Sequence, residues 1–401
     1  MGIEKGVSMK IGIISDSHED RQKMLPEVIN KLITKEKVEI FFHAGDIFAE
    51  HLDAKLFQGL PVVCALTNDD YERHQIGENH DKKNLAAPSD KWTFTHPYME
   101  GDRTEFSGRI VDMDVSVGVK FRIYLGHKRW DDYSYGPESE LIKTIDIIRR
   151  QHDSIRYFIA GHHHRQLFIK FSLITCINPG AIQDSAGVFG GYEYAVIDTE
   201  TDTVIFDRIQ ARTSEKNTLK LGIISDTLEI SEHNKDYWKN LGEIFKSHEI
   251  TDIIHCGNIA PRDIGHTALK KFQIYCNPNL GIDNERKSIP KNWHLQEDKG
   301  FGQDNIPVEI KDYSFLIRLK LGAQMWDQSG FAMHRETLGV KTDHPNTRIV
   351  LCGSSRQTIY IEDEEMAFIN PGCALLDQSF SIIELPRGRL TFGKIPINYQ
   401  S

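Results

Sequence analysis

The chain repeats itself, and this repeat constrains its fold more than any other feature. Five short segments recur in the same order: KIGIISDSH at 10–18 as KLGIISDTL at 220–228, FFHAGDI at 41–47 as IIHCGNI at 253–259, LGHKRW at 125–130 as LGAQMW at 321–326, AGHHHRQ at 160–166 as CGSSRQ at 352–357, and INPGA at 177–181 as INPGC at 369–373. Chance similarity between strands explains one such match, not five in register. The sequence therefore predicts two copies of one unit, at 9–210 and 219–401, joined by the polar segment 211–218.

Length and composition agree with two globular domains. The chain has 401 residues, of which 39% are hydrophobic and 26% charged. Its net charge of −10, without any run of basic residues, disfavours general binding to nucleic acids or anionic membranes, which requires a basic face. No apolar stretch approaches the roughly 18 residues that cross a membrane, the stretch MGIEKGVSMK has no apolar core of signal-peptide length, and the six cysteines form no CxxC pair. We therefore expect a cytoplasmic protein with reduced, buried thiols.

Each copy begins with a strand–helix–strand pattern. In the first copy, a β-branched run at 11–14 is followed by apolar residues at helical spacing within 21–36, and then by a second apolar run at 38–42. Such a crossover joins two parallel strands of an α/β sheet. In open α/β sheets, ligands bind at the carboxyl ends of the strands, and every polar cluster described below follows a predicted strand.

Five polar clusters follow strands of the first copy: Asp16 with His18, Asp46, Asn68 with Asp70, His127, and the run of histidines at 162–164. Each motif alone is typical of an ordinary turn or helix cap. Together they offer hard oxygens and imidazoles without a thiolate, a set that suits Mn²⁺, Fe, Zn²⁺, Ni or Mg²⁺. A carboxylate such as Asp46 can bridge two ions roughly 3.5–4 Å apart, which would generate hydroxide to attack a phosphate ester. The ordered set therefore predicts a two-metal hydrolytic site.

The ordered motifs SDSH, AGD, TNDD, GH and GHHH, followed by INPG, resemble the calcineurin-like metallophosphoesterase superfamily. The pattern of that superfamily is D-x-H, G-D, G-N-x-[DH], H and G-H-x-H, and the resemblance covers about 10–208. It is greatest for the small bacterial and archaeal phosphodiesterases. The resemblance implies an α/β fold of four layers, an αββα sandwich, which the repeat would present twice. It also implies two divalent metal ions, Mn²⁺ foremost.

The resemblance implies a role for each matching position. The first ion would be held by Asp16, His18, Asp46 and His164. The second would be held by Asp46, Asn68, His127 and His162. Asp70, next to Asn68, would orient the scissile phosphate or protonate the leaving group. Arg73 and Arg165 could contact substrate oxygens bidentately, with solvated surface charge as the alternative.

Two positions depart from the family pattern. Thr67 replaces a glycine, which leaves Asn68 and Asp70 in place. Strict register puts Leu125 at the fourth ligand position, with His127 two residues on. Either His127 reaches the second ion after a small shift or that ion has one ligand fewer; we expect the former. We interpret His43 and His96 as structural, because a lone histidine near a turn usually is.

The second copy lacks most of the predicted ligands. It keeps Asp226 but has Leu228 in place of His18 and Asn258 in place of Asp46, and the remaining ligands are replaced by Asn279, Ala323, Ser354, and Ser355 or Arg356. A neutral amide cannot bridge two dications. We therefore expect a metal-free scaffold that packs on the first copy.

These observations predict a hydrolase of small phosphoesters, a phosphodiesterase rather than a monoesterase, with an inert second domain. Two alternatives use the same fold. One is a non-catalytic interaction protein, as the superfamily includes a retromer subunit without catalysis. The other is a sensor that holds a phosphate ligand without metal. Hydrolysis of an aryl phosphodiester with Mn²⁺ would separate the enzyme from both.

Overall fold

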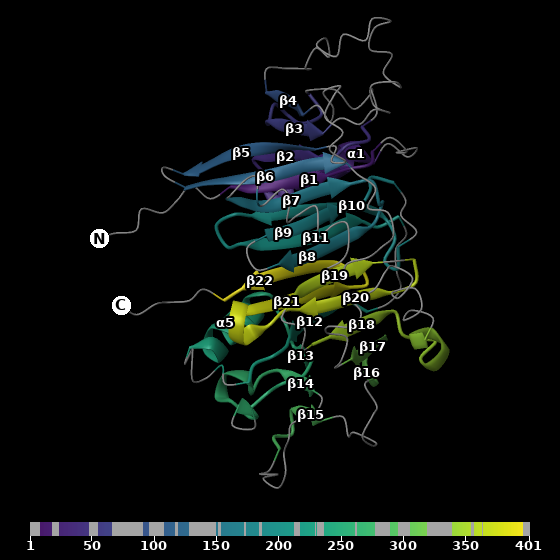
Figure 1. Cartoon of the computed structure of the whole chain (residues 1–401). Helices are drawn as coiled ribbons and strands as arrows, with labels where there is room; N and C mark the ends of the chain where they lie inside the picture. The colour runs from purple at the N-terminus through teal and green to yellow at the C-terminus, as the bar shows by residue number, and fades with distance from the viewer. Residues whose placement is uncertain are drawn as a thin grey trace, which may run out of the picture. The chain divides into compact units, whose positions relative to one another are not determined.

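The computed structural model describes residues 9–17, 24–47, 55–65, 91–95, 108–116, 119–127, 150, 154–171, 174–183, 187–211, 217–228, 230, 236–260, 263–276, 289–295, 305–318, 339–353, 357–362 and 364–395. The described residues up to 211 form one compact unit and those from 217 form another. We call them unit 1 and unit 2 and describe each by itself (Figure 1).

Unit 1 is a sandwich of two mixed sheets. The strands of its first sheet, in sheet order, are β11 (Thr203–Ile209), β10 (Tyr192–Asp198), β1 (Lys10–Ile14), β2 (Ile40–His43), β3 (Val62–Ala65) and β4 (Trp92–Thr95). Strands β1 to β4 are parallel to one another, and β10 is antiparallel to both β1 and β11. The predicted strand–helix–strand crossover therefore joins β1 and β2 as parallel neighbours.

The strands of the second sheet, in order, are β8 (Gln166–Phe171), β9 (Ile174–Pro179), β7 (Ile155–Gly161), β6 (Val119–His127) and β5 (Gly108–Ser116). Here β6, β7 and β9 are parallel, while β5 and β8 run antiparallel to their neighbours. Aromatic side chains join the two sheets: the ring of Phe168 on β8 lies 5.9 Å from that of Phe206 on β11.

Helix α1 (Leu25–Lys31) packs on the first sheet of unit 1. The helix continues into a π-helical turn, η1 (Leu32–Glu36), and ends at Lys37 with a φ of 62°. The apolar residues that predicted this helix are buried in one core cluster with the sheet: Leu25, Val28, Ile29 and Leu32. The helix starts at 25 and not at 21, with Pro26 in its first turn, where proline needs no hydrogen-bond partner.

Unit 2 has the same strand order and strand directions. Its first sheet is β22 (Arg389–Lys394), β21 (Ser379–Leu385), β12 (Leu219–Ile224), β13 (Asp252–His255), β14 (Gln273–Cys276) and β15 (Trp293–Leu295). Its second sheet is β19 (Thr358–Glu362), β20 (Ala367–Pro371), β18 (Ile349–Cys352), β17 (Tyr313–Arg318) and β16 (Asn305–Ile310). Among the helical elements that the structure describes in this unit are α5 (Tyr237–Ser247), η4 (Thr267–Leu269) and α8 (Ala374–Asp377).

Each unit is thus a mixed α/β sandwich, as the sequence predicts. The helices described in unit 1 and the buried face of α5 in unit 2 belong to the core of the first sheet. In the described segments, no helix is long and apolar enough to cross a membrane.

Candidate metal centre

Three predicted ligands meet at the carboxyl ends of unit 1 strands. Asp16 follows β1, Asp46 follows β2 and His164 follows β7, and one ligand atom of each lies within 4.8 Å of the others. Nε2 of His164 is 3.0 Å from Oδ1 of Asp16. Two atoms that bind one ion at about 2.0–2.2 Å lie roughly 3 Å apart, so this spacing fits a shared divalent cation.

The burial of this cluster also favours a cation. Asp16 is fully buried, and Asp46 is only 8% exposed. Two carboxylates gathered in one buried place repel each other, and a cation between them removes that cost. The donor set of two carboxylates and an imidazole is typical of sites for Mn²⁺, Fe or Zn²⁺. The residues present therefore fit the divalent metal that the sequence predicts.

All three ligands have a left-handed backbone. The φ angles are 51° at Asp16, 54° at Asp46 and 52° at His164. Non-glycine residues rarely adopt this conformation, and when they do they gather at functional sites. Two backbone hydrogen bonds hold the first two turns together: Asp16 N–H donates to Gly45 O at 3.0 Å, and Ser17 N–H donates to Asp46 O at 2.9 Å.

One oxygen of Asp16 is fixed by its neighbours. The backbone N–H of His162 donates to Oδ2 at 3.0 Å, and Oγ of Ser15 lies 2.6 Å from the same oxygen. Oγ of Ser15 also lies 2.7 Å from the carbonyl oxygen of Gly180. Because Oδ2 is occupied in this way, Oδ1 is the oxygen that faces His164.

Gly161 is required where the two sheets approach each other. A Cβ at this position would lie 2.5 Å from Ala44 O and 2.9 Å from Oδ2 of Asp16. Asn178 anchors the same point, because its side-chain amide donates to Gly161 O at 3.3 Å and its Oδ1 accepts from Gly180 N–H at 3.0 Å. The INPG motif therefore supports the turn that carries the histidines.

The sequence analysis missed Gln183, whose side-chain amide is hydrogen-bonded to Nδ1 of His164. Metal-binding histidines usually make such a bond with the nitrogen that does not face the metal, which fixes the ring orientation. With Nδ1 occupied, Nε2 is the nitrogen that faces Asp16. Nothing in the sequence distinguishes Gln183 from other single polar residues that follow a turn.

Other predicted site residues are placed only in part. The imidazole of His162 is not among the atoms of the cluster that the described residues form. Arg165 is half-buried at the end of the same turn. His18, Asn68, Asp70 and Arg73 lie outside the described residues, as do His96 and the segments of the second copy that contain Asn279, Ala323, Ser354, Ser355 and Arg356.

The register of β6 bears on the fourth ligand. Leu125 pairs with Ile159 and is fully buried, so it belongs to the core. The backbone of His127 pairs with Gly161, directly before the turn that carries the histidines at 162–164, which we call the histidine turn. The side chain of His127 lies outside the described part of the structure. The register therefore places the backbone of His127, and not that of Leu125, opposite Gly161, and ligation by His127 stays a prediction.

His43 has the structural role that we expected. It is fully buried, and its Nε2 lies 3.1 Å from Oγ of Ser17. In unit 2, Nε2 of His255 lies 2.8 Å from Oγ1 of Thr227. A hydroxyl and a histidine therefore join the ends of β1 and β2 in unit 1, and of β12 and β13 in unit 2, in the same way.

The corresponding edge of unit 2 keeps both turns but has one carboxylate, that of Asp226, where unit 1 has two. Asp226 and Asn258 have φ angles of 55° and 57°, and Asp226 N–H donates to Gly257 O at 3.1 Å. The side-chain amide of Asn258 donates to Oδ1 of Asp226 at 2.5 Å. This hydrogen bond occupies the oxygen that matches the cluster-facing oxygen of Asp16. The described residues form a ligand cluster of this kind in unit 1 alone.

Comparison with known proteins supports the superfamily. The sequence model of the calcineurin-like phosphoesterase superfamily domain matches residues 9–202. No curated protein matches the chain.

Several solved structures resemble part of the chain. A predicted phosphoesterase from Streptococcus pneumoniae is 17% identical over 50% of this chain and 88% of its own, with a TM-score of 0.31. An archaeal phosphodiesterase is 21% identical over 43% of this chain and 98% of its own, with a TM-score of 0.30. Vps29 from Entamoeba histolytica, in complex with zinc, is 13% identical over 50% and 91%, with a TM-score of 0.29.

Proposed function

From the membership of residues 9–202 in the calcineurin-like phosphoesterase superfamily, we propose that unit 1 is a metal-dependent phosphoesterase that hydrolyses small phosphodiesters. The observation that carries this proposal is the cluster of the buried Asp16 and Asp46 with the half-buried His164. Two divalent ions, when bound, would polarise the phosphate and make water nucleophilic at neutral pH.

Each residue of the proposed site then has a defined role. Asp16 and His164 would hold the first ion together with His18, and Asp46 would contact both ions. Asn68, His127 and His162 would complete the second site. Asp70 would orient the phosphate or give a proton to the leaving oxygen, and Arg165, at the end of the histidine turn, would bind substrate oxygens.

The finer parts of this proposal come from the sequence pattern. Asn68 and Asp70 in the motif TNDD, followed by INPG at 177–180, resemble the small phosphodiesterases more than the monoesterases. Mn²⁺ is the metal we propose, from the resemblance to the superfamily, and the set of carboxylates and imidazoles without a thiolate is compatible with it.

We infer further that unit 2 is a second copy of unit 1 that serves as a scaffold. The support is the shared strand order, the left-handed turns at Asp226 and Asn258, and the hydrogen bond between these two side chains where unit 1 has two carboxylates. In this copy, a neutral amide takes the position of the bridging carboxylate.

A matched pair of variants tests the function. Asp46→Asn should reduce Mn²⁺-dependent hydrolysis of bis(p-nitrophenyl) phosphate more than about 100-fold, the upper end of what even a residue behind the ligands costs. Asp226→Asn, the control in unit 2, should leave the rate within about twofold, because we assign no catalytic role to Asp226. Full activity of Asp46→Asn, or a wild-type chain that hydrolyses neither this diester nor p-nitrophenyl phosphate, would refute the proposal.

A further inference from the structure

A buried ion pair lies behind the histidine turn of unit 1. Glu193 on β10 and Arg208 on β11 are cross-strand partners, with Nη1 of Arg208 2.9 Å from Oε1 of Glu193. Both side chains are buried, at 0% and 1% exposure. Buried ion pairs add little to stability on average, because desolvation offsets the attraction. Because of this desolvation cost, stability alone is a weak explanation for burying Glu193 and Arg208.

The first contact of this pair is with the end of the histidine turn. Nη2 of Arg208 donates to Oε1 of Gln166 at 2.7 Å. Gln166 is the first residue of β8 and follows directly on His164 and Arg165. Its own amide nitrogen lies 3.1–3.3 Å from three backbone carbonyls, those of Pro179, Tyr194 and Asp207. The side chain of Gln166 is therefore held at both of its polar ends.

The second contact is with the support of Asp16. Gly180 packs directly on the carboxylate of Glu193, since a Cβ at Gly180 would lie 2.0 Å from Oε2. The backbone N–H of Glu193 also donates to Ala181 O at 2.9 Å. The carbonyl oxygen of Gly180 lies 2.7 Å from Oγ of Ser15, the hydroxyl that contacts Asp16. A continuous set of contacts thus leads from Glu193 to this metal ligand.

Unit 2 builds the same fold without this ion pair. The register of β21 with β22 places Ser379 opposite Lys394, as Glu193 stands opposite Arg208, and Thr358 pairs with Pro371 as Gln166 pairs with Pro179. A Cβ at Gly372 would meet hydroxyls of Thr358 and Ser379. The strand order therefore does not need the ion pair, which occurs in the unit that has the ligand cluster.

We propose that Glu193 and Arg208 are positioning residues, which set the histidine turn and Asp16 at the spacing that binds a divalent metal. The inference rests on the proposed function of unit 1 and deepens it. The alternative is that the ion pair only stabilises unit 1. These two roles predict different results. If the ion pair positions the ligands, its loss weakens metal binding beyond what an equal loss of stability elsewhere in unit 1 would cause. If it only stabilises unit 1, its loss does not.

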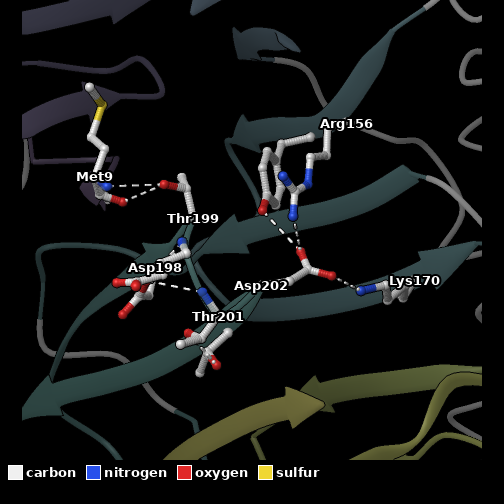
Figure 2. Close-up of polar contacts among 10 residues, drawn as sticks. Met9, Arg156, Lys170, Asp198, Thr199, Thr201 and Asp202 are labelled. Atoms are coloured by element: carbon white, nitrogen blue, oxygen red, sulfur yellow. Dashed lines mark hydrogen bonds and ion pairs between the residues drawn. The ribbon is translucent and has the colours of Figure 1, made fainter. Parts of the chain in front are cut away.

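A second polar cluster in the same hairpin provides the control. Asp202, in the turn between β10 and β11, accepts hydrogen bonds from Arg156 at 2.9 Å, Lys170 at 2.9 Å and the hydroxyl of Tyr157 at 3.1 Å (Figure 2). The register places this turn beyond the pair Asp198–Thr203, at the opposite end of the hairpin from Glu193 and Arg208. Asp202→Asn thus removes a charge of the same sign in the same unit, away from the site.

The experiment measures the dissociation constant of the full-length chain for Mn²⁺ by electron paramagnetic resonance, without substrate, and the melting temperature in EDTA. Glu193→Gln should weaken Mn²⁺ binding about 10–100-fold, as loss of a supporting residue does at other metal sites. Asp202→Asn should lower the melting temperature but keep the dissociation constant within about twofold. If Glu193→Gln does not fold, Glu193→Gln combined with Arg208→Met removes both charges and should show the same weakening.

Unchanged Mn²⁺ affinity in the Glu193 variant, or in the double variant where it is needed, would overturn this inference. Equal weakening in Asp202→Asn would also overturn it, in favour of general stabilisation. Both outcomes leave the proposed function intact. A wild-type chain that binds Mn²⁺ no better than Asp46→Asn would instead overturn the proposed function, and this inference with it.

Discussion

The ligand edges of the two units share a backbone and differ in side chains. Asp16 and Asp226 both have left-handed φ angles, and so do Asp46 and Asn258. The left-handed turn therefore occurs both with the carboxylate of Asp46 and with the amide of Asn258. This comparison teaches that one backbone accepts either side chain, so that a few side chains, and not the turns, distinguish the two edges.

Three buried positions next to the ligand turns hold alanine in unit 1 and cysteine in unit 2. Cys256, Cys352 and Cys373 occupy the positions that Ala44, Ala160 and Ala181 have in the repeat of unit 1. Burial raises the pKa of all three thiols. Protonated, buried thiols pack as small apolar groups. Leu228, which replaces His18, is 47% exposed. The edge of unit 2 therefore has larger buried side chains at these three positions, and an apolar Leu228 where unit 1 has His18.

The strongest test of the comparison uses Gly161 and Gly353. A Cβ would lie 2.5 Å from Ala44 O in one unit and 2.4 Å from Cys256 O in the other. Substitution of either glycine by alanine should cost about 1–3 kcal/mol of stability through overpacking. Gly161→Ala should also abolish tight Mn²⁺ binding, since its Cβ displaces Asp16, whereas Gly353→Ala should not. Urea unfolding and Mn²⁺ titration check this, and equal metal affinities in the two variants would break the comparison.

A smaller effect concerns acid stability. Burial lowers the pKa of His255 to about 3, and the usual unfolded value is about 6.5. Between these values the unfolded chain binds a proton that the folded chain does not, so the stability that neutral His255 provides is lost as the pH falls. Wild-type protein should lose about 2 kcal/mol more than His255→Gln between pH 7 and pH 5. Parallel pH profiles of urea unfolding for the two proteins would contradict this.

The smallest expected effect is that of Gln183. Gln183→Ala should weaken Mn²⁺ binding about tenfold, because the ring of His164 loses the hydrogen bond that orients it. Leu375 occupies the matching position in unit 2 and packs against the core there. Leu375→Ala should lower stability and leave Mn²⁺ affinity unchanged. Isothermal titration calorimetry of both variants decides whether Gln183 acts on the metal site or only on packing.

Local patterns predicted much of the fold. The β-branched run at 11–14 became β1, the apolar stripe of Leu25, Val28, Ile29 and Leu32 became the buried face of α1 and η1, and INPG closed β9. The meeting of Asp16 with Asp46 could be predicted because the carboxyl ends of the parallel neighbours β1 and β2 share an edge. His164 follows β7 in the second sheet, and its place beside them was expected from the resemblance to the superfamily. Apart from the place of His164, these features depend on short segments and on one general rule of sheet architecture.

The supporting contacts could not be predicted. Glu193 and Arg208 face each other across the hairpin of β10 and β11, but the residues they contact, Gln166 and Gly180, lie outside it. Gln183 follows β9 and contacts His164, which precedes β8. The choice between Leu125 and His127 likewise depends on how β6 pairs with β7. Sequence periodicity gives the face of a strand, but not its register with a remote partner.

The most direct test of the central claim is the number of divalent ions in the intact chain. Metal analysis by inductively coupled plasma mass spectrometry, after loading with Mn²⁺ and removal of excess, should give two ions per chain. Asp226→Asn should retain both, because unit 1 holds them, and Asp46→Asn should lose at least one, because Asp46 would contact each. Four ions per chain, or a count that falls with Asp226→Asn and not with Asp46→Asn, would contradict the assignment of the metal site to unit 1.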